Sequence, residues 1–188
     1  MYSKLKNVIE FVEGRLSAKR FTHVNGVIET AKMLAERHAV NVADAELAAL
    51  VHDVAKEQDI DQMRAILRLK GEFTYLEHSH KVWHAPLGAI IAKETFGIEN
   101  PDILNAIKFH TTGRPEMSDL EKVIFVADYT EPNRKFEGAI AVREFWGDLD
   151  RAVYEILKQK VEKNTSLELS MHPDTLDAYE YYKRLVMG

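Results

Sequence analysis

The chain contains no cysteine, no large basic block and no long run of apolar residues. Without cysteine, neither a disulfide nor a thiolate metal site can form, so any metal ion must be held by nitrogen and oxygen atoms. The longest apolar runs are far shorter than the roughly 20 residues that cross a membrane, so we expect no membrane partner. The first residues, MYSKLKNVIEFVEG, also lack the apolar core and cleavage site of a signal peptide. These absences predict a cytoplasmic protein.

The balance of charge is mildly acidic, with a net charge of −5 at pH 7 over 188 residues. Proteins that bind nucleic acid over a wide surface carry a basic face, so we expect no nucleic-acid partner. The net charge does not exclude a local basic pocket for a small anion. Apolar residues make up 46% of the chain and charged residues 29%, which is typical of a globular protein. The length suits one core, and we predict a single domain over residues 1–188.

Apolar residues recur at helical spacing nearly throughout the chain. The first stripe is formed by Leu5, Val8, Ile9, Val12 and Leu16. The same spacing predicts further helices near residues 23–35, 44–52, 60–70, 86–96, 101–109, 119–128, 149–161 and from 174 onward. No alternating run is long enough for a sheet, and irregular segments are expected at 71–84, 110–117 and 130–138. The sequence therefore predicts an all-α fold.

Helix ends are indicated by residues with known capping preferences. We expect Asp44 to cap the third helix, and Gly71 to end the fourth. Pro86 lies just inside the start of the fifth helix. Ser118 and Glu121 have the spacing of a capping box before the seventh.

Histidines and aspartates occur at core-facing edges of these helices. Asp128 closes the apolar run VIFVAD, and a carboxylate among apolar residues normally needs a partner or a metal ion. His52 lies on the same helical face as Ala48 and Ala49, and Asp53 follows about 100° further round the helix. The set is completed by His23, in the first turn of the second helix, His84 and His110.

Each of these residues alone is weak evidence for a metal site. A single histidine near a helix end is usually a surface or capping group, and a His-Asp pair is common. Asp128 could equally be satisfied by an arginine or by backbone donors. The conjunction of imidazoles and carboxylates from five regions is what predicts a divalent cation.

Cationic side chains follow or precede the suspected ligands, which indicates an anionic substrate. Arg20 lies three residues before His23, Lys56 three residues after Asp53, and Arg134 shortly after Asp128. Arg114 follows His110, but a solvated surface role is the better interpretation for it.

Two further segments offer groups that could bind phosphate. The loop HTTGR presents hydroxyl groups, including Thr111. His172 and Thr175 lie at the start of the last helix, whose backbone amides could meet a phosphate or a sugar, although an ordinary helix start explains them equally well. His38, His78 and His80 have no place in this scheme.

The chain resembles the HD-domain metal-dependent phosphohydrolases, whose signature is H…HD…D on a helical bundle. The resemblance extends over about residues 5–185, with the signature region at about 18–130, and is close to the bacterial YqeK family. It is carried by the segments FTHVNGVIETAKMLA, AALVHDVAKE, WHAPLGAIIAKETFGI, AIKFHTTGRPEMSDLEKVIFVADYTEPNRKFEG and MHPDTLDAY. HTTGR followed by ADYTEPNR is far more specific than the HD pair. The YqeK family is assigned as symmetrical diadenosine tetraphosphatases.

The resemblance implies roles for particular residues. The metal ligands are His23, His52, Asp53 and Asp128. The extra histidines of the family match His84 and His110, which would hold a second ion or contact phosphate. Lys56 matches the family lysine one turn after the HD pair, and with Asp53 it is expected to be catalytic. The substrate would contact Arg20, Lys56, Thr111, Arg134, His172 and Thr175.

One or two divalent ions are therefore expected. The donor set suits iron, manganese, cobalt, nickel or zinc, and the resemblance favours iron. The implied reaction is symmetrical cleavage of diadenosine tetraphosphate to two ADP. Two alternatives stay open: an HD-type nucleotidase or (deoxy)nucleoside triphosphate hydrolase, and a metal-dependent nucleotide-binding module without turnover. The expected partner is a small nucleotide, and a homodimer is left open.

Overall fold

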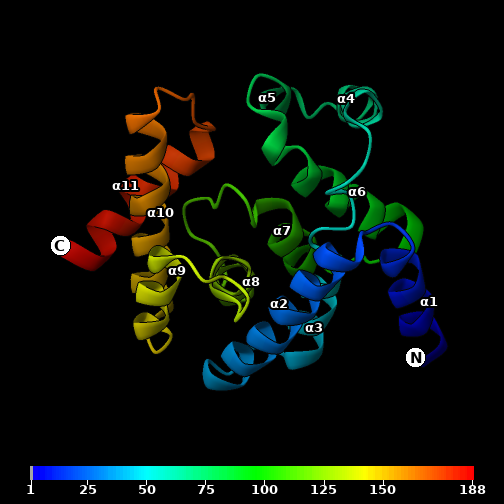
Figure 1. Cartoon of the computed structure of the whole chain (residues 1–188), viewed down its shortest axis with the longest axis horizontal. Helices are drawn as coiled ribbons and strands as arrows, with labels where there is room; N and C mark the ends of the chain where they lie inside the picture. Colours follow the sequence, from blue (N-terminus) through cyan, green and yellow to red (C-terminus); the bar gives the residue numbers. More distant parts are fainter. Residues whose placement is uncertain (1) are drawn as a thin grey trace.

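The computed structural model describes residues 2–188, with side chains from Leu5 onward (Figure 1). No strand occurs among these residues, so the all-α prediction is confirmed. The α-helices are α1 (Tyr2–Glu13), α2 (Ala18–Arg37), α3 (Val42–Val51), α4 (Ile60–Leu69), α5 (Phe73–Leu76), α6 (His84–Phe96), α7 (Pro101–Phe109), α8 (Asp119–Thr130), α9 (Glu137–Val142), α10 (Leu149–Ser166) and α11 (Pro173–Met187). Two short 3₁₀ helices are η1 (His80–Val82) and η2 (Arg143–Phe145). The extent of a single domain over residues 1–188 stays a prediction.

Two helix starts differ from those expected. The Ser17 side chain accepts a hydrogen bond from the Arg20 amide, so α2 begins earlier and His23 lies in its second turn, not its first. The cap of α3 is Asn41, whose side chain accepts from two backbone amides, and the prediction of Asp44 as the cap was wrong. Asp44 lies instead in the first turn, where a carboxylate favours the positive end of the helix dipole.

Other helix ends are partly as predicted. Gly71 follows α4 in a left-handed conformation with φ of 77°. The Ser118 hydroxyl accepts from the Glu121 amide, as in a capping box, but the Glu121 carboxylate binds Arg114 instead of returning to the Ser118 amide. The helix α6 begins at His84, two residues before Pro86.

The segments expected to be irregular contain short helices that the sequence pattern did not reveal. The range 71–84 includes α5 and η1, and α9 begins at Glu137, within the range 130–138. The pattern also did not indicate η2. These elements have three to six residues, which is too short for a helical repeat of apolar positions to be recognised.

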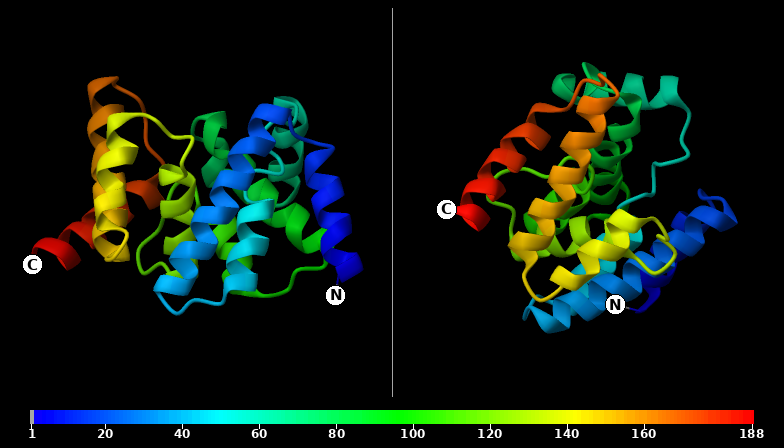
Figure 2. Two further views of the ribbon diagram at one scale, coloured as in Figure 1. Left: turned by 60° about the horizontal axis from the view of Figure 1, so that its bottom comes forward. Right: turned by 60° about the vertical axis from the view of Figure 1, so that its left-hand side comes forward.

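The helix α8 is the centre of the fold. Its residues 123–127 are all buried, so apolar surface lies on every side of the helix. It packs against α2, α3, α7, α9 and α10. The figures show α8 between α2 and α10 (Figures 1 and 2). Asp128 and Thr130 are therefore carried by the most enclosed helix.

A smaller apolar cluster lies beneath α4, α5 and α6, and includes Met63, Leu67 and Trp83. The helix α6 approaches the main core closely at Gly88. A Cβ atom there would lie 3.2 Å from Ile107 Cγ2 and 3.3 Å from the backbone oxygen of His52. Because glycine permits this approach, α6 brings its first residues, one turn earlier, toward the end of α3.

In the described part of the chain, none of the helices combines the length and the apolar character needed to cross a membrane.

Candidate metal centre

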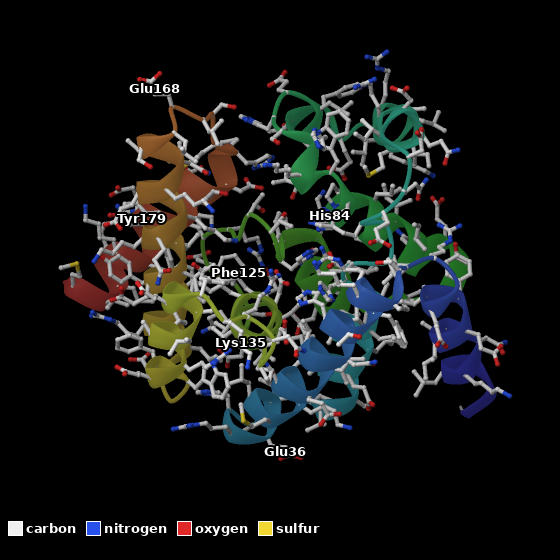
Figure 3. The ribbon with its side chains drawn as sticks, in the orientation of Figure 1. Glu36, His84, Phe125, Lys135, Glu168 and Tyr179 are labelled. Carbon is white, nitrogen blue, oxygen red and sulfur yellow. The ribbon has the colours of Figure 1, made fainter. Side chains whose placement is uncertain are left out.

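Six side chains from separate parts of the fold meet at one place. Helices α2, α6 and α8 each contribute a residue, and three more follow directly after the ends of α3 and α7. The six residues are His23, His52, Asp53, His84, His110 and Asp128. Five of them are buried, among them His84, whose position toward the interior is marked in Figure 3. Asp128 is the exception, with a side chain that is 21% exposed. The residues predicted as ligands from the sequence are therefore brought together.

Asp53 lies between two pairs of histidines. Its Oδ2 atom is 3.7 Å from His23 Nε2 and 3.6 Å from His52 Nε2. Its Oδ1 atom is 3.2 Å from His84 Nε2 and 3.7 Å from His110 Nε2. His23, His52 and Asp53 form a first triad, and Asp53, His84 and His110 form a second triad. In each triad the donor atoms lie within 4.8 Å of one another. One carboxylate thus serves two adjoining sites that could each hold an ion.

Asp128 adds a second carboxylate to the first triad. Its Oδ1 atom lies 3.0 Å from His23 Nε2 and 3.8 Å from His52 Nε2. The same oxygen is 3.1 Å from Arg134 Nη2. An arginine that neutralised Asp128 in a dry interior would argue against a metal site. Arg134 is 36% exposed, however, and both residues line an open cavity, so this pair is not of that kind.

The histidine rings are oriented so that their Nε2 atoms face the cluster. The Nδ1 atom of His52 lies 2.5 Å from the Ala49 carbonyl oxygen, and that of His110 lies 2.7 Å from the Ile107 carbonyl oxygen. A carbonyl only accepts, so each Nδ1 must carry the hydrogen and leave a lone pair on Nε2. The Nε2 atoms of His23 and His52 are buried and lack a partner in hydrogen-bond geometry. Such orphaned acceptors fit a metal ion.

The charge states of His52, His84 and Asp53 also suit a cation, whereas the carboxylates of Asp128 and Glu131 raise the pKa of His23 despite its burial. Burial lowers the pKa of His52 and of His84 to about 4, so both rings are neutral at pH 7. Burial alone would raise the pKa of Asp53, but the surrounding histidines, His52 first, hold it well below its usual range. Neutral imidazoles and ionised carboxylates are the forms that bind divalent metals. The donor set of nitrogen and oxygen atoms fits iron, manganese, cobalt, nickel or zinc.

Glu131 is a site residue that the sequence analysis did not identify. It is buried, with 1% of its surface exposed. Its Oε1 atom lies 3.1 Å from His23 Nδ1, and its Oε2 atom accepts from the Asn133 amide at 2.7 Å. Its only signal in the sequence is a carboxylate three residues after Asp128. A carboxylate that accepts from the outer nitrogen of a ligand histidine fixes the ring and raises its basicity.

Replacing Glu131 by glutamine is therefore expected to weaken metal binding and activity by about 10- to 100-fold without unfolding the protein. Glutamine keeps the size of the side chain but loses the charge beside His23. The affinity is measured by metal titration of the chelator-treated protein. The matched control is Glu36→Gln, at an exposed glutamate on the outer end of α2 (Figure 3). Equal metal affinity in Glu131→Gln and the control would contradict this role.

Three of the four suspected cations lie at the cluster. Arg20 Nη1 is 3.0 Å from Asp53 Oδ2. Lys56 Nζ is 3.3 Å from His84 Nε2, at the other triad, and Arg134 contacts Asp128 as described. Arg114 is not part of the site, because its guanidinium group binds Glu121 through two nitrogen atoms, with a 2.7 Å bond from Nε.

A cavity of about 720 Å³ opens beside Asp128. Its lining includes four of the residues predicted to contact substrate: Thr111, Arg134, His172 and Thr175. Lys160 also lines it and was not predicted, although a lysine four residues after the apolar Ile156 was a signal. A second cavity, of about 530 Å³, borders the cluster at Arg20, His23 and Arg134.

The remaining histidines lie at different distances from the site. His78 lines the larger cavity, and His80 lines a separate one with Lys56 and His84. His38 lies elsewhere, with its Nε2 atom 2.8 Å from the Trp146 carbonyl oxygen.

Residues 20–133 match the HD domain family, a range that includes every member of the His/Asp cluster. The chain belongs to the HD-domain family. The resemblance stated from the sequence motifs is thereby confirmed, and the helical bundle is the HD fold.

Relatives of this HD-domain protein cover nearly its whole length. It is 42% identical over 91% of its length, and 92% of the relative, to a Halalkalibacterium halodurans protein named symmetrical bis(5′-nucleosyl)-tetraphosphatase. It is 40% identical to the protein of the same name from Bacillus subtilis, over 90% and 92% of the two chains. A crystal structure from Clostridium acetobutylicum, described as a predicted HD superfamily hydrolase involved in NAD metabolism, is 33% identical, with a TM-score of 0.91 over 96% and 97% of the chains.

Proposed function

We propose that this HD-domain protein is a metal-dependent phosphohydrolase that cleaves diadenosine tetraphosphate symmetrically into two ADP. The structural observation that carries the proposal is the pair of triads sharing Asp53 and opening, at Asp128, into a cavity lined by cations. The names of the curated relatives support the choice of substrate.

The site residues divide into two groups in this proposal. One ion would be held by His23, His52, Asp53 and Asp128, and a second by Asp53, His84 and His110. Divalent ions bound there would neutralise phosphate oxygens and lower the pKa of a bound water. The orphaned Nε2 atoms and the low pKa of Asp53 support this assignment. Iron is proposed from the family resemblance.

The reaction itself is a hydrolysis at the centre of the tetraphosphate. A water oxygen forms a bond to one of the two central phosphorus atoms, and the bond from that phosphorus to the central bridging oxygen breaks. Two ADP molecules leave, and protons are released. Lys56 and Arg134 lie at the two ends of the His/Asp cluster, where their charges would stabilise the negative charge that develops on the phosphate oxygens.

The other proposed substrate contacts follow from the two cavities. Thr111, His172 and Thr175 would face one nucleotide half in the larger cavity, and Arg20 would face the second half in the smaller one. The Thr111 hydroxyl and His172 Nε2 are buried atoms without a hydrogen-bond partner within the described chain, so a ligand that reached them would satisfy both. Two cavities on one cluster suit a substrate with two nucleoside ends.

The test is an assay of the metal-loaded protein with chromatographic separation of the products. Diadenosine tetraphosphate is expected to yield ADP alone, and removal of the metal by a chelator is expected to abolish turnover until a divalent metal is restored. Equal amounts of AMP and ATP would contradict symmetrical cleavage. Faster turnover of nucleotides or (deoxy)nucleoside triphosphates would favour the alternative hydrolase. Binding without turnover under any divalent metal would favour the binding module.

The cytoplasmic location and the homodimer considered from the sequence stay predictions.

A further inference from the structure

One face of α10 forms a wall of the larger cavity. The residues of this wall are spaced at i, i+3, i+4 and i+7, as expected for a single helical face. They are Lys160, Lys163, Asn164 and, directly after the end of the helix, Leu167, and Gln159 lines the cavity beside them. Lys163 and Leu167 are exposed, whereas Lys160 is half-buried and lies one turn nearer the core. Of the two lysines in this wall, Lys160 is therefore the one whose charge is more buried.

No opposite charge is in direct contact with the Lys160 ammonium group, and the charge of Asp128 acts on it across the cavity. Its Nζ atom donates to the Thr111 carbonyl oxygen at 2.7 Å and lies 4.3 Å from the centre of the Phe125 ring. Figure 3 marks Phe125 between α8 and α10. No carboxylate of the described residues lies within 4.0 Å of this ammonium group. A half-buried cation without a counter-ion lowers the stability of the fold, so a bound anion would complete its environment.

The cavity as a whole is suited to an anion with an apolar end. Its cations are Lys81, Arg134, Lys160 and Lys163, whereas Asp128 is the only carboxylate among its described lining residues. Burial lowers the pKa of Lys160 to about 8, so most of this side chain is still charged at pH 7. Among the neighbouring charges, that of Asp128 acts most strongly on Lys160 and raises its pKa, whereas those of Lys56 and Arg134 lower it. Arg134 and Lys160 line this cavity together, whereas Lys56 lines a separate one.

The lining of the cavity also includes apolar side chains. They are Phe136, Leu167, Leu169 and Met171. Phe136 is 45% exposed, and Leu167 and Leu169 are 56% and 52% exposed, so each has surface available to a ligand. A ligand that combines phosphates with a nucleoside would match a lining that combines cations with apolar side chains.

We propose that Lys160 binds a phosphate group of the nucleotide half that occupies the larger cavity. This inference rests on the proposed function for the identity of the full substrate, but not for the phosphate contact itself. The ammonium group would retain its bond to the Thr111 carbonyl and use a remaining hydrogen to bind a phosphate oxygen. Lys160 is then a substrate-binding residue contributed by α10, outside the HD-matched range 20–133.

A purely structural role is the competing explanation. The bond from Lys160 to Thr111 could serve only to hold the loop after His110, and through it the second triad. The two roles differ in what the substitution Lys160→Met changes. Loss of a loop contact lowers thermal stability and metal content, whereas loss of a phosphate contact lowers nucleotide affinity and leaves metal content unchanged. Removing a half-buried charge also keeps or raises the melting temperature.

The experiment compares the wild type with Lys160→Met, Lys160→Arg and the control Lys158→Met, on the same helix but not in the cavity wall. Each manganese-loaded protein is titrated calorimetrically with ADP, and its metal content, melting temperature and kinetics with diadenosine tetraphosphate are measured. Lys160→Met is expected to raise the ADP dissociation constant and KM by about tenfold or more, because a charge-assisted hydrogen bond is lost. Lys160→Arg should recover most of the affinity.

An ADP affinity in Lys160→Met within twofold of the wild type would overturn the proposal. A fall in melting temperature and metal content, with affinity restored by excess metal, would overturn it in favour of the structural role. If the wild type binds ADP but does not cleave diadenosine tetraphosphate, the proposed function fails. The ADP titration then decides the role of Lys160 by itself.

Discussion

Replacement of Asp53 by asparagine is expected to remove both metal ions and to lower the rate of hydrolysis by about 1000-fold or more. The two carboxylate oxygens face different pairs of histidines, so no other side chain can take over this position. Asparagine has nearly the same size but is uncharged, and its NH₂ group cannot act as a ligand. The expected loss corresponds to the several kcal/mol that a metal ion contributes to a charged transition state.

The effect of Asp53→Asn is measured by elemental analysis of the purified variant and by steady-state kinetics at saturating manganese. The control is Asp61→Asn, because the Asp61 side chain is 84% exposed at the start of α4. Circular dichroism checks that the helices remain. An Asp53→Asn protein with the metal content and rate of the wild type would refute the central position of this residue.

Replacement of Asp128 by alanine is expected to have a more selective effect on metal content. Asp128 lies beside His23 and His52 of the first triad, but it is not part of the second triad, which contains His84 and His110. The variant should therefore lose the ion of the first triad and retain the ion of the second, about half of the wild-type content. Activity should still fall by about 100-fold or more, because the phosphate-facing charges are rearranged and Arg134 loses its partner.

The Asp128→Ala prediction is checked by metal content per chain, compared side by side with Asp53→Asn and the wild type. Retention of half the metal in Asp128→Ala, with none in Asp53→Asn, would be the signature of two ions sharing one carboxylate. An equal loss of metal in the two variants would instead indicate a single ion held by all the ligands together.

The helices and the residues of the His/Asp cluster could be predicted from the sequence because their signals are local. Asp128 stands out in an apolar stripe, and the HD pair follows small residues that allow close helix packing. By contrast, both Asn41 and Asp44 are good N-caps, and only the path of the chain into α3 decides between them. The short helices after Gly71 and before Leu149 have too few residues for apolar positions to repeat at helical spacing.

The contacts that complete the site could not be predicted because they join distant parts of the chain. His23 and Glu131 are 108 residues apart, and Thr111 and Lys160 are 49 residues apart. Arg114 follows a suspected ligand, His110, in the sequence, as a phosphate-binding arginine could, yet its side chain binds Glu121. Only the packing of α8 against α2 and α10 shows which charged groups face the cluster.

The two cavities beside the cluster have different walls, and Arg134 is common to both. A molecule with two identical ends that lies across this arginine would have each end in different surroundings. A hybrid dinucleotide with two different bases would consequently have two non-equivalent orientations, and the oxygen taken up from water would enter one product in preference to the other. The protein would thus distinguish the two chemically identical halves of a symmetrical dinucleotide.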